Sequence, residues 1–131
     1  MIQMGSIVRV TDKTGVILGR CVKVLGSRKN RIAFLGDVVL ISVRKINIQR
    51  FRRLKARRRK RFALGTLHRA LVIRSKVNFC RTPGVFIKFG ENAVVLVNKK
   101  IVPVSNRIFG PVLKEFCMRW PSIGCVTRCL V

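Results

Sequence analysis

Acidic residues are scarce in this sequence. Its 131 residues include 29 Lys and Arg but only 4 Asp and Glu, which gives a formal net charge of +25. A surface whose charges neutralise one another needs both signs, so this composition excludes an ordinary mixed surface. A free chain with so much charge of one sign repels itself. We therefore expect an external polyanion as partner, and nucleic acid is favoured over an anionic membrane.

Side chains for catalysis or metal binding are also few. His68 is the only histidine. There are five cysteines, an odd number, and no two of them form a Cys-x-x-Cys pair. A zinc site needs four closely spaced ligands, and a disulfide framework normally accompanies an export signal. The four acids, Asp12, Asp37, Glu91 and Glu115, form no pair placed for acid–base chemistry. We expect no enzyme, no metal and no cofactor, and ordinary thiols.

Long apolar runs and tyrosine are missing as well. No stretch reaches the about 20 apolar residues that a membrane-spanning helix needs. The opening residues, MIQMGSIVRVTD, match neither a signal peptide nor a mitochondrial presequence. We expect that the chain is made where it works or that this sequence begins at the mature end.

With no Tyr and eight Phe, mostly in apolar strands, we expect contacts to folded RNA, not stacking on single-stranded bases.

Short alternating and β-branched segments predict an all-β domain. The hydrophobic fraction of 49% and the length suggest one domain with a real core. A helix is expected only within 107–120, with Pro111 in its first turn and Pro121 at its end. Short strands separated by turns favour a small barrel or sandwich. The expected strands are 6–11, 16–26, 35–46, 67–76, 85–89 and 93–98, the last two joined as a hairpin through 90–92.

A dense cationic segment interrupts these strands. Nine of the twelve residues from Arg50 to Arg61 are Lys or Arg, within an insertion at 48–67. We expect a hairpin arm that reaches out from the barrel. A nuclear localisation signal, or a membrane-surface helix with a narrow apolar stripe at 51, 54 and 62, would be the alternatives. The excess of arginine, which binds phosphate with two hydrogen bonds, favours nucleic acid.

The candidate nucleic-acid contacts are basic residues of this segment and of other loops and strands. They are Lys23, Arg28, Lys29, Arg31, Arg50, Arg52, Arg53, Lys55, Arg57, Arg58, Arg59, Lys60, Arg61, Arg74, Lys76 and Arg81.

Five stretches, in order, resemble the universal large-subunit ribosomal protein fourteen family. They are MIQ at the start, CVKVLGSRKNRIAFLGD (21–37), LVIRSK (71–76), IKFGENAVVLVN (87–98) and NRIFGPVLKE (106–115). The resemblance implies a closed five-stranded antiparallel barrel in one domain, 1–131, with a short helical part at 106–131. It also implies a structural protein that binds large-subunit rRNA at the intersubunit face.

The resemblance further implies partners. These are large-subunit rRNA, neighbouring large-subunit proteins and small-subunit rRNA across an intersubunit bridge, but no membrane and no small-molecule substrate. Ribosome silencing factor would dock at the motif that holds Asn106 and Arg107. Separately from the resemblance, we expect Phe109 to serve in core or interface packing and not in base stacking. A free nucleic-acid-binding barrel protein of an organelle, acting in RNA processing or in a nucleoid, is the alternative.

Some stretches depart from the family pattern. They are DKTG at 12–15, the insertion, Ser105-Asn106 before Arg107, and an ending with three cysteines. Divergence with excess cations suggests an organellar ribosome, mitochondrial as first choice and plastid as second.

Overall fold

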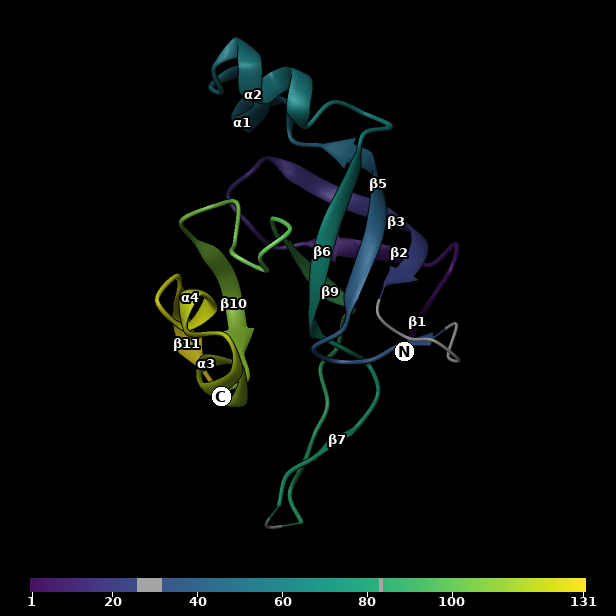
Figure 1. Cartoon of the computed structure of the whole chain (residues 1–131), viewed down its shortest axis with the longest axis vertical. Helices are drawn as coiled ribbons and strands as arrows, with labels where there is room; N and C mark the ends of the chain where they lie inside the picture. The colour runs from purple at the N-terminus through teal and green to yellow at the C-terminus, as the bar shows by residue number, and fades with distance from the viewer. Residues whose placement is uncertain (26–31, 83) are drawn as a thin grey trace.

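Five strands close into a barrel in the computed structural model of the protein, which describes residues 1–25, 32–82 and 84–131 (Figure 1). This confirms the all-β barrel, and every barrel strand falls within a predicted one. In ring order the strands are β2 (Ile7–Val10), β3 (Val16–Leu25), β5 (Val38–Ile46), β6 (Leu67–Arg74) and β9 (Ala93–Leu96).

The direction of the strands differs from the prediction at one place. Four neighbouring pairs are antiparallel, but β2 and β9, which close the ring, run parallel. A closed ring with an odd number of strands cannot alternate direction all the way round. A wholly antiparallel five-stranded barrel is therefore impossible, and that detail of the prediction was wrong.

Two apolar clusters lie on the two sides of the barrel wall. The alternation in β5 sends Val39, Ile41 and Val43 to the barrel interior. In contrast, β6 from Ala70 onward and all of β9 are buried on both faces. Their outer side chains pack against the C-terminal part of the chain, which explains why residues 70–73 of β6 and all of β9 are apolar without alternation.

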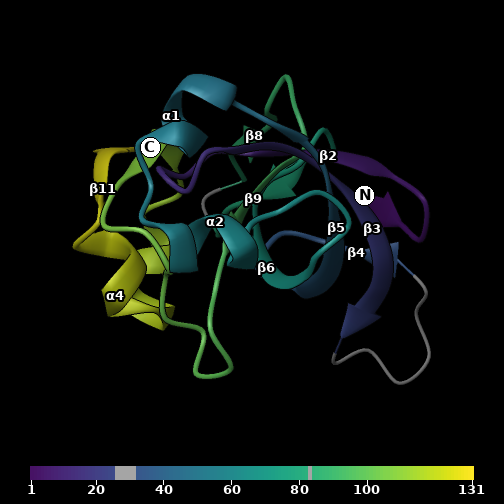
Figure 2. The same cartoon turned by 90° about the horizontal axis from the view of Figure 1, so that it is seen from above.

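The cationic segment folds into two short helices, α1 (Ile48–Arg52) and α2 (Ala56–Arg61), that connect β5 to β6 (Figure 1, Figure 2). Phe62 is only 3% exposed, and half-buried Phe51 and Leu54 pack against the barrel core. We call residues 48–62 the cationic cap. The segment joins two neighbouring antiparallel strands, as predicted for a hairpin. It does not extend away from the barrel as an arm, because its apolar side chains are buried against the end of the barrel.

The predicted hairpin through residues 90–92 was wrong. Strand β8 (Phe86–Ile87) pairs with β7 (Phe79–Cys80), and the two project from the end of the molecule opposite the cap (Figure 1). Strand β9 pairs instead with β6 and β2. All of β9 is buried, so it takes a place inside the ring, whereas Phe86 of β8 is exposed.

The C-terminal part mixes strands and helices. Residues predicted to begin a helix form β10 (Ile108–Val112), followed by α3 (Glu115–Arg119) and α4 (Pro121–Gly124). Gly110, inside β10, has a φ of +83°, which no α-helix accommodates, so Pro111 lies in a strand and not in a first turn. Strand β11 (Thr127–Leu130) runs parallel to β10.

Two short strands complete the fold, β1 (Ile2–Gln3) paired with β4 (Ile32–Ala33). In the described part of the chain, every helix is too short or too polar to cross a membrane.

Candidate nucleic-acid interface

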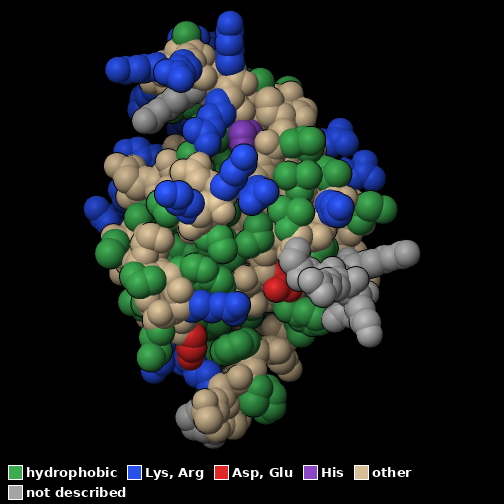
Figure 3. Space-filling view, in the orientation of Figure 1, with side chains coloured by type: hydrophobic (Ala, Val, Ile, Leu, Met, Phe, Trp, Pro, Cys, Tyr) green, Lys and Arg blue, Asp and Glu red, His purple; other side chains and the backbone are tan. Residues whose placement is uncertain are grey.

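The cationic cap carries the densest positive charge of the described surface. Its sequence contains no acid. Figure 3 shows Lys and Arg side chains gathered over this end of the molecule. None of the ion pairs between described residues involves the cap. Among its predicted contacts, the exposed ones are Arg50, Arg52, Arg53, Lys55, Arg57, Arg59, Lys60 and Arg61, while the side chain of Arg58 lies outside the described set.

The backbone of the cap is fixed by local hydrogen bonds. Asn47 caps α1, since its Oδ1 accepts hydrogen bonds from the backbone N–H groups of Gln49 at 3.1 Å and Arg50 at 3.3 Å. The side chain of Arg59 reaches back, and its Nε donates to the carbonyl of Leu54 at 2.9 Å. The cations are thus presented from ordered helices.

His68 ties the end of the cap to β6. Its Nε2 lies 2.8 Å from the carbonyl oxygen of Arg61, and its ring packs on Phe62 with centroids 5.2 Å apart. A carbonyl only accepts, so Nε2 carries the proton. Burial lowers the pKa of His68, the hydrogen bond with the Arg61 carbonyl opposes this shift, and the Arg61 charge adds to it. His68 thus has a structural role where the cap meets β6.

Phe109 connects the cap to β10. The guanidinium carbon of Arg50 lies 5.0 Å from the ring centroid and that of Arg107 lies 5.3 Å from it. Both distances are within cation–π range. Half-buried Phe109, which belongs to the same motif as Arg107 and exposed Asn106, thus packs between the Arg50 side chain of the cap and the Arg107 side chain. The predicted RNA-binding segment and the predicted partner-binding residues are neighbours in space.

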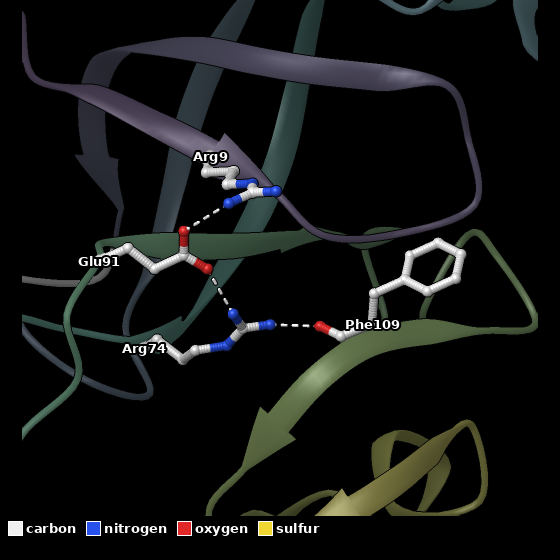
Figure 4. A network of polar contacts seen from close by, with 4 residues as sticks. All are labelled: Arg9, Arg74, Glu91 and Phe109. Carbon is white, nitrogen blue, oxygen red and sulfur yellow. Dashed lines mark hydrogen bonds and ion pairs between the residues drawn. The ribbon is translucent and has the colours of Figure 1, made fainter.

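Arg74 lies inside the protein, contrary to its prediction as an RNA contact. It is 6% exposed, its Nη1 pairs with Glu91, and its Nη2 donates to the carbonyl of Phe109 (Figure 4). Glu91 also accepts from Nη1 of Arg9 at 2.9 Å. Burial lowers the pKa of the Arg74 guanidinium, and the Glu91 carboxylate opposes this shift. Arg74 therefore links β6, the loop before β9 and β10, with little surface left for phosphate.

Arg81 is likewise engaged within the chain. Its Nε donates to Glu115, and its Nη2 donates to Glu115 at 3.1 Å and to the carbonyl of Val131 at 2.6 Å. The hydrogen bond from Arg81 is the main cause that lowers the pKa of Glu115. Arg81 thus fastens the loop between β7 and β8 to the C-terminal part. The acidic partners of Arg74 and Arg81, Glu91 and Glu115, could not be identified from the sequence, because each lies many positions from its arginine along the chain.

The remaining predicted contacts are separate from the cap. Lys23 on β3 and Lys76 after β6 are exposed. The predicted contacts Arg28, Lys29 and Arg31 lie outside the described residues.

Among the described residues, no group of three or more His, Cys, Asp or Glu side chains is placed to hold a metal ion. The five cysteines are free thiols: Cys21 is buried, Cys117 half-buried, and Cys80, Cys125 and Cys129 are exposed.

Comparison with known families matches the whole chain. The family model described as Ribosomal protein L14p/L23e covers residues 1–131, which includes the barrel, the cap and the C-terminal part. Such proteins are generally structural components and not enzymes, which fits a site built of cations on a rigid barrel. This chain therefore belongs to the Ribosomal protein L14p/L23e family of structural proteins of the large ribosomal subunit.

Proposed function

We propose that the protein binds large-subunit rRNA through its cationic cap, at the intersubunit face, where it also contributes to a bridge with small-subunit rRNA. The observation that carries this proposal is the set of exposed, acid-free cations on two helices anchored to the barrel. Each cation that meets a phosphate releases counterions and so contributes to affinity. The barrel fixes where these charges lie, so it can hold rRNA segments at a set spacing.

Arginine suits this role better than lysine would. The planar guanidinium binds a phosphate with two hydrogen bonds and stays charged. Seven of the nine cap cations in 50–61 are arginine. We infer that the cap offsets phosphate repulsion where segments of rRNA come together.

The test compares two variants with the same net charge. In one, Arg52, Arg53, Arg57 and Arg59 of the cap become Gln. In the other, four exposed arginines outside the cap become Gln: Arg20, Arg44, Arg69 and Arg128. We expect the cap variant to remain folded, to enter large subunits poorly, and to bind rRNA with a salt slope about 3 to 4 units less steep. Equal subunit occupancy for the two variants would refute the role of the cap.

We propose the mitochondrial ribosome as the location, with the plastid ribosome second, on the strength of the departures from the family pattern. Sedimentation of an organelle lysate in high salt without magnesium, followed by mass spectrometry, tests this. We expect this protein to peak in the gradient fractions that contain the large subunit. If it stays at the top of the gradient at both high and low salt, it would instead be a free nucleic-acid-binding protein.

Asn106 and Arg107 are proposed to contact a neighbouring protein, with ribosome silencing factor as the candidate. The support is their matched motif and their surface position beside Phe109. Replacing Arg107 by Ala is expected to weaken capture of this factor by purified large subunits, without loss of subunit occupancy.

A further inference from the structure

A groove of about 420 Å3 lies where the cationic cap meets the barrel. One wall comes from the cap, through Leu54, Arg61 and Phe62. The opposite side comes from the turn at 12–15 and from residues 104–106, so three distant parts of the chain meet here. Its size falls within the about 300–1,000 Å3 typical of small-ligand sites. Because the cap supplies one wall, the groove depends on the folded cap.

The lining combines an apolar floor with a cationic rim. Half-buried Leu54 and Val104 and nearly buried Phe62 supply the apolar part of the lining, which we call its floor. Lys13 and Arg61 are exposed at the rim, and none of the described residues that line the groove is acidic. An apolar surface between two cations suits a ligand that is flat and apolar at one end and anionic at the other.

Part of the polar lining is already engaged. Nη2 of Arg61 donates to Oδ1 of Asn98 at 3.2 Å, and the Arg61 guanidinium carbon lies 5.6 Å from the Phe62 ring centroid, so these contacts leave only its other N–H groups for a phosphate. The Thr14 hydroxyl donates to Asp12, and the Ser105 hydroxyl accepts from the Lys13 backbone N–H at 3.2 Å and donates to the Arg107 carbonyl at 3.0 Å. Asn106 is exposed, and its side chain makes no hydrogen bond to any other described residue. An asparagine amide offers one donor and one acceptor side by side, the pattern that matches a base edge.

We propose that this groove binds one unpaired nucleotide of RNA, with its base on the floor, its phosphate near Lys13 and Arg61, and its base edge on Asn106. This inference rests on the proposed function and adds to it a pocket for a single base. When a base occupies Asn106, the proposed contact with a neighbouring protein rests on Arg107 alone. A protein side chain is the less suitable occupant, since an apolar one leaves both cations unused and an acidic one leaves the floor uncovered.

The test uses two RNA hairpins with the same stem, one fully paired and one with a single bulged 2-aminopurine. We expect the full-length protein to bind the bulged hairpin about tenfold more tightly, the range typical of burying one base. Val104→Trp fills the groove and leaves every cap cation in place. It should abolish this preference and the fluorescence change of the bulged base, while affinity for the paired hairpin stays the same.

The matched control is Val102→Trp, an exposed position two residues away that does not line the groove. It should keep the preference. If Val104→Trp fails to fold, the surface variants Lys13→Gln and Asn106→Ala should each reduce the preference severalfold. Equal binding of both hairpins by the unmodified protein, or a preference that survives Val104→Trp, overturns the pocket but leaves cap binding intact. Failure to bind either hairpin contradicts the proposed function itself.

Discussion

Gly110 shows how one residue position depends on a distant side chain. Its φ is +83°, and a Cβ placed there would lie 2.7 Å from Nη2 of Arg74. An alanine would therefore strain the backbone and also displace a guanidinium that holds Glu91 and the carbonyl of Phe109. Glycine is required here for two separate reasons.

We predict that Gly110→Ala lowers the free energy of unfolding by clearly more than Gly65→Ala, as measured by urea denaturation. Gly65 has a similar φ of +80°, but no atom of the described residues lies within 4 Å of the position that a Cβ would take there. Gly65→Ala should therefore lower the free energy of unfolding only by the cost of placing an alanine in the left-handed region, about 1–2 kcal/mol. Equal costs at the two sites would mean that the Arg74 contacts add nothing.

Asp12 is an acid whose place in the fold is wholly internal. It is 2% exposed, and its carboxylate accepts hydrogen bonds from the backbone N–H groups of Thr14 at 2.9 Å and Leu96 at 3.1 Å. Burial raises the pKa of the Asp12 carboxyl, and these hydrogen bonds only partly offset the rise. The folded protein thus holds this proton more tightly than the unfolded chain does.

The stability due to this proton is present below the unfolded pKa of Asp12 and is lost as the pH rises through the folded pKa. We predict that the unmodified protein loses stability relative to Asp12→Asn as the pH rises above about 4, where an ordinary aspartate ionises. The unfolding free energies of both proteins, measured at a series of rising pH values, test this. Other groups, such as Glu115, titrate in both proteins and cancel in the difference. A difference that does not change with pH would contradict the raised pKa.

At the scale of elements, the cap is held by its few apolar side chains. We predict that Phe62→Ala lowers the free energy of unfolding by about 3–5 kcal/mol, because it empties a buried site between cap and barrel. Phe86→Ala is the matched control, since Phe86 is 66% exposed and should change stability by less than about 0.5 kcal/mol. The thermal unfolding midpoints of the two variants, each compared with that of the unmodified protein, test this prediction. Similar midpoints for the two variants would mean that Phe62 does not anchor the cap.

The sequence predicted the barrel strands because their signal is local. Alternation in 6–11 and the apolar runs of 67–76 and 93–98 are visible within a few residues. The cap was missed as a helical element, because its charge dominated the interpretation. The signals were present: Asn47 as a helix cap, and the apolar residues Phe51 and Leu54 among the cations.

Pairing between distant elements could not be predicted in this way. Arg74 and Arg81 looked like free cations because their acidic partners lie 17 and 34 positions along the chain. The parallel pairing of β10 with β11 also joins segments that carry no shared local pattern. Such contacts depend on the folded arrangement and not on any short window of sequence.

At the scale of the whole molecule, the net charge of +25 opposes folding in the absence of RNA. We predict that raising sodium chloride from about 0.1 M to about 1 M increases the thermal unfolding midpoint, since the screening length falls from about 10 Å to about 3 Å. The variant with four cap arginines replaced by Gln should respond less. A midpoint that falls with salt in both proteins would contradict this account.

The parallel contact that closes the barrel also has a consequence for biosynthesis. Arg9 pairs with Ala93 and Val10 with Val94, so β2 meets its second neighbour 84 positions later in the chain. Contacts of such separation are slow to form. During translation the ring stays open until β9 has left the exit tunnel, and by then all of the cationic cap has been made. A nascent chain can thus present its positive charge to RNA before its own barrel has closed.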